Sequence, residues 1–390
     1  GHVIGVQTCA LPISTATRLL RIYGEDVGLN TGFIIHDRSD SEDFIDVLRT
    51  ELGFDRSQNR FPKKGTCFAI HSNCVNSQRP LKQVLNDHFP WCASYEEELQ
   101  DLFRLYGESK DQSSVLDYDD LLLFFRGLLA NDGGALVRNR FDCVLVDEYQ
   151  DTNRLQADIV RLLRPDGSGL TAVGDDAQSI YSFRAASVHN IIEFPQQFPG
   201  TRLVKLEQNY RSTPAILKAT NALIAAAKQG HRKELWSQRD TGSQPQLLCC
   251  SDETSQAEYV ADRVLTHREE GIALKRQAVL FRAAHHALLL ESELTRRQIP
   301  YVKYGGLKFL EAAHIKDLMA ILRLAENPRD LISGMRVLQL LPGVGPRTAR
   351  KLAEKVTVSD APFAAWYRER LPTESRQPWT LLLELLEKLR

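Results

Sequence analysis

The sequence predicts an α/β fold built on a parallel sheet that helices cover on both faces. Short apolar runs, rich in β-branched residues, recur after residue 113 and occupy 143–146, 170–173, 203–206, 246–250 and 277–281. Helical patterns lie between several of these runs, and this alternation is typical of parallel sheets. Ligands bind beyond the carboxyl ends of the strands in such sheets, so the polar residues after each run are the candidates for chemistry.

The first part of the chain, from residue 15 to residue 112, has helical periodicity instead. Apolar residues recur at three- and four-residue spacing in 18–23 and 43–52, and further helices are expected at 81–88 and 95–106. No acid–base constellation stands out there, which indicates a helical accessory region. A helix at 118–125 leads into the first apolar run, and a last helical block is expected from about 309 to 390.

Composition limits the class of protein. With 43% hydrophobic and 25% charged residues, the 390-residue chain suits two or three globular domains. No run approaches the roughly 18 apolar residues of a membrane helix. The net charge of −1 argues against a surface coated in basic charge, but it allows a local basic groove for nucleic acid. The seven cysteines contain no C-x-x-C pair, so we expect buried thiols in a reducing cytoplasm rather than zinc or disulfides.

The first candidate cluster follows the run at 143–146. Asp147 and Glu148 are adjacent carboxylates at the end of a strand, and Gln150 and Asp151 come shortly after them. One carboxylate can hold Mg²⁺, usually through water, while its neighbour accepts a proton from an attacking water. Phosphoryl transfer needs both functions close together. Most Asp-Glu pairs are solvated surface residues, but the preceding apolar strand favours a functional pair here.

The second cluster, 174–184, directly follows the run at 170–173. Gln178 is an uncharged donor and acceptor that suits a terminal phosphate or the water attacking it. Tyr181, Phe183 and Arg184 combine aromatic faces with a cation, and this combination stacks unpaired bases at about 1–3 kcal/mol per base. The alternative is that the two aromatic side chains pack in the core.

The third cluster places Arg211 after the run at 203–206 and before a helix that Ser212 or Thr213 caps, with Pro214 in its first turn. An arginine fixed there can reach the γ-phosphate across a cleft. An isolated arginine at a helix start is more often part of a surface ion pair, and it is the neighbouring clusters that favour the functional interpretation.

The fourth cluster lies at 341–352, where Gly343 and Gly345 flank one apolar residue in the pattern of a helix-hairpin-helix. Exposed backbone amides and a following helix N-terminus suit a DNA phosphate. Residues 341–356 contain four basic residues, Arg347 among them, against one acidic residue. A plain helical hairpin with solvated charges is the alternative.

Taken together, in this order and spacing, the clusters resemble the UvrD/Rep/PcrA family of superfamily 1 helicases. The resemblance runs from about residue 15 to about residue 352. It is most specific in V-L-V-D-E-Y-Q-D, G-D-D-A-Q-S-I-Y-S-F-R, L-E-Q-N-Y-R-S-T and the later Y-G-G-L-K-F-L-E-A-A-H-I-K-D at 304–317. The stretch 117–122 is also similar to the family's approach to its Asp-Glu strand.

The resemblance implies RecA-like P-loop NTPase motor domains that close on ATP and Mg²⁺ and step 3′ to 5′ along single-stranded or forked DNA. In that scheme Asp147 binds Mg²⁺ and Glu148 is the catalytic base. Gln178 couples the phosphate state to the grip on DNA, and Arg211 contacts the γ-phosphate. Tyr181, Phe183 and Arg184 line the strand, although family members often have tryptophan where this chain has Phe183.

The resemblance also implies a location in the bacterial cytoplasm or nucleoid, and a domain layout. We expect a helical 1B-like accessory subdomain at 15–112, part of the first motor domain at 113–200 and part of the second at 201–308. The start of a 2B-like helical insertion, with the hairpin, is expected at 309–390. The stretch 5–13 resembles the translated frame of a sequencing adapter, so segment 1–14 is expected to be non-native and outside the fold.

Two other classes remain open. The helicase subunit of a recombination helicase–nuclease shares these motifs. A degenerate helicase that acts as a single-strand-binding scaffold needs none of Asp147, Glu148, Gln178 and Arg211, so their joint presence argues against it. A separate helix-hairpin-helix module leaves the parallel sheet unexplained.

The chain contains no G-x-x-x-x-G-K-[ST] phosphate loop, and the family's second γ-phosphate arginine is expected beyond residue 390. We therefore expect this polypeptide to be a fragment that does not hydrolyse ATP at a useful rate. A steady-state ATPase assay of the purified chain with single-stranded DNA checks this. Robust turnover would refute it.

Overall fold

The computed structural model describes residues 3–7, 11–54, 61–131, 133–227, 230, 233–240, 242–304, 313–357, 362–367, 369 and 375–389. It divides into two compact units. Unit 1 consists of Gly1–Glu207, Leu223–Glu234 and Asp317–Arg390, and unit 2 of Gln208–Ala222 and Leu235–Lys316. Each unit is described separately.

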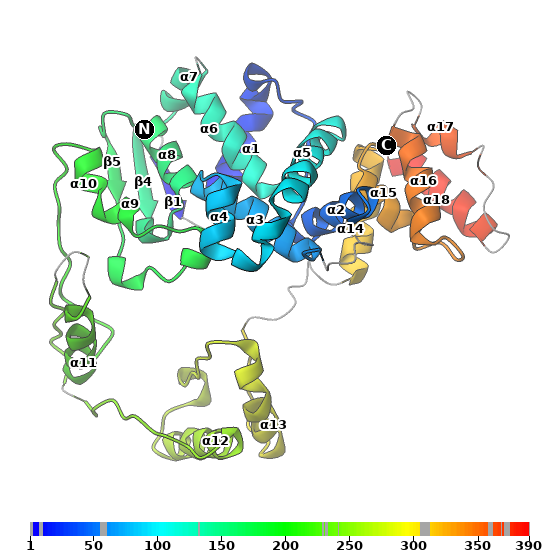
Figure 1. The fold of residues 1–390 in the computed structure, drawn as a ribbon. Coiled ribbons are helices and arrows are strands. Elements are labelled where there is room, and N and C mark those ends of the chain that lie inside the picture. Colours follow the sequence, from blue (N-terminus) through cyan, green and yellow to red (C-terminus); the bar gives the residue numbers. More distant parts are fainter. Residues whose placement is uncertain are drawn as a thin grey trace. The chain divides into compact units, whose positions relative to one another are not determined.

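Unit 1 contains a three-stranded parallel sheet in the order β1-β4-β5, with β1 at Val3–Gln7, β4 at Cys143–Asp147 and β5 at Leu170–Ala172 (Figure 1). Val144 pairs with Leu170 and Val146 with Ala172, so β4 and β5 run in step toward their carboxyl ends. A second, two-stranded parallel sheet pairs β2 (Ile34–Ile35) with β3 (Val115–Leu116). The predicted runs at 143–146 and 170–173 are thus confirmed as parallel strands.

The sheet packs its helices mainly against one face. Val144 and Val146 on β4 are 1% and 2% exposed and join a core with residues of α1 (Leu11–Tyr23), α6 (Tyr118–Ala130) and α8 (Arg154–Leu163). Leu145 between them is 41% exposed. Successive side chains of a strand point to opposite faces, so the other face is open at this position. The prediction of helices on both faces is wrong here, among the residues that the structure describes.

Two further cores of unit 1 are formed mainly by helices. One joins α2 (Arg38–Glu51), α3 (Lys64–Ser77), α4 (Leu81–His88) and α5 (Glu96–Gln112), and Ile332 also packs in it. The other joins α14 (Ala313–Glu326), α15 (Leu331–Leu338), α16 (Pro346–Thr357), α17 (Pro362–Trp366) and α18 (Arg376–Leu389). The expected helices at 18–23, 43–52, 81–88, 95–106 and 118–125 are present. The remaining short helices of unit 1 are α7 (Gly134–Arg138), α9 (His189–Ile192) and α10 (Phe194–Gln197).

The packing divides the front of the chain at a different place from the sequence. Residues of α1, together with Phe33, belong to the core of the sheet and not to the core of α2–α5. The expected accessory region at 15–112 therefore begins, by packing, only near α2. Within segment 1–14, the described residues Val3–Gln7 also have a place in the fold as β1, which pairs with β4, and α1 begins at Leu11. Its adapter origin stays a prediction.

The buried start of α6 explains why the chain has three aspartates at 117–120. Asp117 caps the helix by accepting a hydrogen bond from the Asp120 amide at 2.9 Å, and its other oxygen accepts one from Lys110 at 2.7 Å. Burial raises the pKa of Asp119 to about 7. The Asp119 carboxylate accepts a hydrogen bond from Asn76 at 2.7 Å, and Asn76 accepts one from Asn153 at the start of α8. These buried hydrogen bonds tie α3, α6 and α8 together.

A buried pair of side chains joins the residues just before α2 to the start of α15. Nε2 of His36 lies 3.2 Å from Oδ1 of Asp330, and the side chains are 1% and 0% exposed. Asp330 is also the N-cap of α15, and its carboxylate accepts hydrogen bonds from the amide and hydroxyl of Ser333. Burial opposes ionisation of this carboxyl group, but the contacts with His36 and Ser333 outweigh it and lower its pKa. Arg323 pairs with Asp40 nearby.

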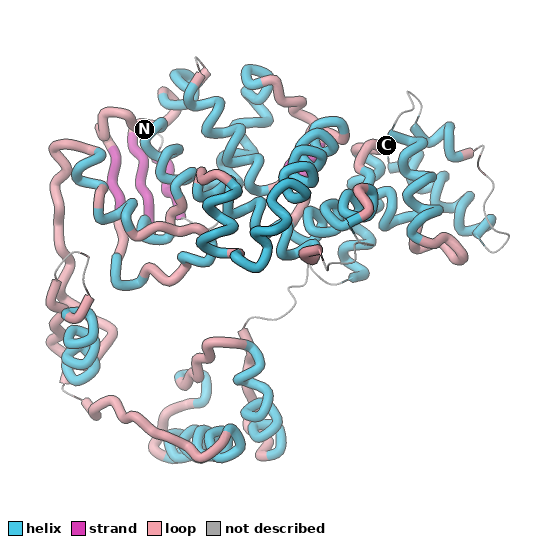
Figure 2. Tube along the Cα trace, in the orientation of Figure 1, coloured by secondary structure: helices cyan, strands magenta, loops and turns pink. Residues whose placement is uncertain are grey.

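Unit 2 contains α12 (Glu253–Glu269), α13 (Leu288–Arg296) and most of α11 (Pro214–Ala225). The strands predicted at 246–250 and 277–281 are absent, as is the one predicted at 203–206 in unit 1. Figure 2 shows the described residues just before α11, and those between α11 and α12, as loop. An apolar run becomes a strand only when it pairs and is covered, and Leu206, Leu247 and Leu280 are 80%, 93% and 93% exposed. Composition alone predicted a sheet that these runs do not form.

Two expectations from composition can be compared with the structure. Among the residues it describes, no helix has the length and apolar character needed to cross a membrane. Cys67 and Cys92 are buried, and burial raises the pKa of Cys67 to about 12. Cys249 and Cys250 are exposed, so the expectation of buried thiols fails for this pair because the run that holds it is not in a sheet.

Replacing Asp330 tests the junction. Asp330→Ala leaves His36 buried without its partner and removes the cap of α15, so we expect the free energy of unfolding to fall by roughly 3 kcal/mol. Because its folded pKa is lowered, Asp330 stabilises the protein above the unfolded value near pH 4, and this contribution is lost as the pH falls further. Urea unfolding at pH 7 and pH 3 measures both effects.

Glu108→Ala is the matched control, because Glu108 pairs with Arg104 on the surface, with side chains 51% and 63% exposed. We expect a change below about 0.5 kcal/mol from it. Equal losses from the two variants would contradict a special role for the buried pair.

Candidate functional site

Asp147 and Glu148 lie at the carboxyl end of β4, as predicted. Both are exposed, and Oδ1 of Asp147 accepts a hydrogen bond from the Glu148 amide at 3.0 Å. Glu148 has φ 51° and ψ 42°, in the left-handed region that side chains other than glycine rarely adopt. Such strained positions cluster at functional sites, where surrounding contacts hold them. The sharp turn starts a short 3-10 helix at Tyr149–Asp151.

Gln150 connects this turn to the second cluster. Its side chain is 1% exposed, and its Nε2 donates to Oε2 of Glu148 at 2.7 Å. Its Oε1 accepts a hydrogen bond from the Asp175 amide at 2.9 Å. Both polar atoms of one buried amide are thus satisfied by the two loops, which fixes the loops relative to each other.

The loop after β5 positions Gln178 through Asp175. One oxygen of the Asp175 carboxylate accepts from Nε2 of Gln178 at 2.9 Å, and the other accepts from the Ala177 amide at 3.0 Å. Burial would raise the pKa of Asp175, but the hydrogen bonds from Gln178 and Lys233 lower it. Glu148 and Gln178 are therefore linked through only two intervening residues, Gln150 and Asp175.

Gly174 makes this approach possible. A methyl group there would lie 2.6 Å from Oε1 of Gln150 and 2.6 Å from Cδ1 of Ile191. A larger residue would require the end of the Gln150 or Ile191 side chain to move, and the glycine at the start of the G-D-D-A-Q sequence avoids this.

The residues predicted to form an aromatic surface come shortly after Gln178 in the sequence. Phe183 is 67% exposed and Tyr181 is half-buried, with ring centroids 5.9 Å apart. Phe183 is therefore not a core residue. Phe183 and Arg184 belong to a short 3-10 helix, Ser182–Arg184. The side chain of Arg184 is outside the described residues. The antiparallel bridge between Asn153 and Ala186 attaches this segment to the start of α8.

Arg211 lies in unit 2, so its position relative to Glu148 and Gln178 stays a prediction. Its side chain is exposed, and Asn209 holds the turn by accepting from the amides of Arg211 and Ser212 at 2.9 and 2.7 Å. The helix begins at Pro214, and the carbonyl of Thr213 accepts from the Leu217 amide. The Thr213 hydroxyl has no hydrogen-bond partner, so this side chain is not the predicted cap.

The hairpin at 341–352 is formed as expected, between α15 and α16. Gly343 has φ 75° and is exposed, as is Gly345, while Val344 between them is 6% exposed and packs in the core. The side chain of Arg347 is outside the described residues. The basic charge is partly compensated, because Arg350 pairs with Glu51 and Glu354, and Lys355 with Glu369. The later motif at 304–317 lies mostly outside the described residues.

The residues fit Mg²⁺ only as a nucleotide-bound ion. Among the described residues no group of three or more His, Cys, Asp or Glu side chains is arranged to hold a metal. Mg²⁺ typically takes one or two carboxylates, water and the phosphates of the substrate, and one exposed carboxylate at a strand end, Asp147, suits that role. A second oxygen of Asp147 is left after its bond to the Glu148 amide.

Sequence patterns do not indicate three residues of this site. Gln150 stands in the sequence only as a neighbour of the Asp-Glu pair, and no pattern points to Asp175 or Lys233. The position of Gln150 two residues after Glu148, beyond the end of a strand, is a usable signal. Lys233 is 57 residues or more away from the carboxylates it contacts, so no local pattern indicated it.

Comparisons with known proteins show similarity to bacterial helicases. Residues 13–199 match the model of the UvrD/REP helicase N-terminal domain, and residues 204–388 match that of the UvrD-like helicase C-terminal domain. The chain is 35% identical over 355 residues to DNA helicase II of Salmonella typhimurium and of Escherichia coli, covering 89% of this chain and 48% of each relative. It is 31% identical over 361 residues to the ATP-dependent DNA helicase PcrA of Staphylococcus epidermidis, covering 90% of this chain and 48% of the relative. It thus spans about half the length of these relatives.

Gly174→Ala tests the contact between the two loops. The added methyl group must displace Gln150 or Ile191, so we expect unfolding to become easier by about 1–3 kcal/mol, the usual penalty of overpacking. Urea unfolding followed by circular dichroism measures it. Gly127→Ala is the control, because Gly127 lies in α6 with nothing within 4 Å of the added carbon, and alanine is the better helix former. A neutral Gly174→Ala would show that the loops are not closely packed.

Proposed function

The chain belongs to the UvrD/Rep helicase family, and from that membership we propose that it is part of an ATP-dependent DNA helicase that translocates 3′ to 5′ on single-stranded DNA. Forked DNA is the proposed substrate and the bacterial cytoplasm the proposed location, in repair, replication or recombination. The chain holds parts of two motor domains, with the helical regions as accessory subdomains.

One observation carries the proposal furthest. A continuous hydrogen-bonded path runs from Glu148 through Gln150 and Asp175 to Gln178, at the carboxyl ends of two adjacent parallel strands. The exposed ring of Phe183 lies five residues beyond Gln178. Residues suited to water activation, phosphate sensing and base stacking therefore follow one another on adjoining loops.

The proposed roles follow from the chemistry of each side chain. Bound Mg²⁺·ATP supplies the reactive phosphate and its charge-neutralising cation. Asp147 would hold that cation, and Glu148 would accept a proton from the attacking water. The amide of Gln178 would exchange its bond with Asp175 for one with the terminal phosphate or the water. Arg211 would approach the γ-phosphate from the second motor domain.

This exchange of hydrogen bonds would couple ATP hydrolysis to the grip on DNA. Gln178 and Tyr181 are three residues apart in one loop, so a shift of the Gln178 amide alters the backbone that carries the aromatic rings. Tyr181, Phe183 and Arg184 would stack and hold unpaired bases. The amides near Gly343 and Gly345, with Arg347, would bind phosphates of the duplex ahead.

The aromatic loop can be tested in the chain as it stands. We expect Phe183→Ala and Tyr181→Ala each to weaken binding of a fluorescein-labelled oligo(dT) by about 1–3 kcal/mol for one lost stacking contact. Fluorescence anisotropy at two salt concentrations measures the affinity and separates stacking from phosphate contacts.

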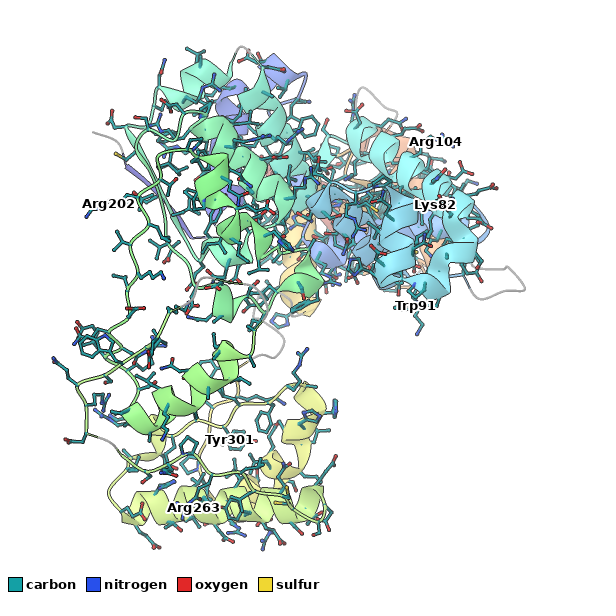
Figure 3. All side chains as sticks on the ribbon, turned by 60° about the vertical axis from the view of Figure 1, so that its left-hand side comes forward. Lys82, Trp91, Arg104, Arg202, Arg263 and Tyr301 are labelled. Carbon is teal, nitrogen blue, oxygen red and sulfur yellow. The ribbon has the colours of Figure 1, made fainter. Side chains whose placement is uncertain are left out.

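Trp91→Ala is the matched control. Trp91 is 68% exposed, about as much as Phe183, and its side chain projects from the helical part of unit 1 (Figure 3). We expect it to leave the affinity unchanged. Wild-type affinity in Phe183→Ala and Tyr181→Ala, or equal binding of duplex and single strand by the unaltered chain, would overturn the proposal.

A further inference from the structure

The segment that follows α11 is attached to the loop that carries Gln178. The ammonium group of Lys233 contacts the carboxylates of both Asp175 and Asp176, the latter at 3.1 Å. These side chains are 16%, 27% and 12% exposed, respectively. All three lie in unit 1. The contact is therefore a largely buried ion pair, in contrast to the many exposed pairs of this chain.

A second observation shows how closely this segment approaches. Gly230 has φ 130°, a backbone conformation that other residues rarely adopt, and a Cβ placed on it would overlap with a carboxylate oxygen of Asp176. The amide of Glu234, one residue past Lys233, donates to the carboxylate of Glu207 at 3.3 Å. Lys233 and Glu234 each make a polar contact with other residues of unit 1, and the backbone of Gly230 passes close to the loop that Lys233 contacts.

The contact with Lys233 offsets negative charge on this loop. Asp175 and Asp176 are adjacent carboxylates on the loop that would face the phosphates of a nucleotide, and like charges at short range repel. Burial would lower the pKa of Lys233, but its two carboxylate partners raise it, so the side chain stays charged. One lysine thus offsets two negative charges where an anionic ligand must approach.

The two sides of the contact belong to different domains by sequence. Asp175 and Asp176 fall within the match to the N-terminal domain model, which ends at residue 199. Lys233 falls within the match to the C-terminal domain model, which begins at residue 204. The ion pair therefore joins the loop of one motor domain to sequence assigned to the other.

We propose that Lys233 is a positioning residue that holds Asp175 and Asp176 and, through Asp175, the side chain of Gln178. The meaning of Gln178 as a phosphate sensor rests on the proposed function, but the positioning itself does not. When the Gln178 amide leaves Asp175 for a phosphate, Lys233 remains to compensate the carboxylate that it uncovers. Sequence of the second motor domain then helps to set the position of the sensor in the first.

Hydrogen exchange in the loop 174–184 tests this without nucleotide or DNA. The amides of Ala177, Gln178 and Ser179 bond to atoms of Asp175 or Asp176, so their protection reports on the order of this loop. We expect Lys233→Met, which keeps the length of the side chain but not its charge, to speed exchange there roughly tenfold, as loss of a charge-assisted contact does. Lys233→Arg restores most of the protection, since a guanidinium can also bridge two carboxylates.

Gly230→Ala tests the close approach independently and should speed exchange in the same peptide. Lys64→Met is the matched control, because Lys64 pairs with Asp43 at 2.5 Å with side chains 42% and 37% exposed. We expect no change in the loop from it. Exchange in peptides of β4 and α6, and urea unfolding, are measured in every variant.

The outcomes separate positioning from general stability. Faster exchange confined to 174–184 in Lys233→Met, with rescue in Lys233→Arg, supports the proposal. Unchanged loop exchange, or faster exchange spread equally over β4 and α6, overturns it. Since no nucleotide or DNA is present, failure of the DNA-binding test would leave this result intact, and the reverse also holds.

Discussion

The in-step parallel pairing of β4 with β5 is the constraint on which the rest of the site depends. It brings the ends of two strands, more than 20 residues apart in sequence, to one edge of the sheet, so the turn at Glu148 and the loop at Gly174 meet. Gln150 can then satisfy both loops with one buried amide, and Gly174 leaves the room it needs. A register shift of one residue would exchange the faces of β4 and separate these partners.

Local patterns predicted the fold well where one element suffices. The periodicity of 18–23 and 43–52 and the pattern at 118–125 indicated helices that are present, and two apolar runs are parallel strands. Failures came where the outcome depends on distant partners. The runs at 203–206, 246–250 and 277–281 have the composition of buried strands but no pairing partner among the described residues. Helix α3 has no amphipathic pattern and was not foreseen, because it is packed by α2, α4, α6 and α8 on several sides.

The site shows the same division between local and distant information. The positions of Asp147, Glu148 and Gln178 at the carboxyl edge of the sheet could be predicted, because each lies at the end of a strand or in the loop after one. The exposure of Phe183 also agrees with a binding surface. Lys233 could not be predicted, since nothing near it in sequence indicates a carboxylate partner at Asp175. The pairing of Arg350 with Glu51 could not be predicted for the same reason. It makes the hairpin less basic than its composition suggests.

The exposed apolar runs affect the behaviour of the protein in concentrated solution. Leu206, Leu247 and Leu280 lie in stretches of backbone that make few hydrogen bonds within the chain, and their composition favours extended pairing. Unpaired segments of this kind associate between molecules, edge to edge. Concentrated solutions of this polypeptide will therefore tend to aggregate through these runs.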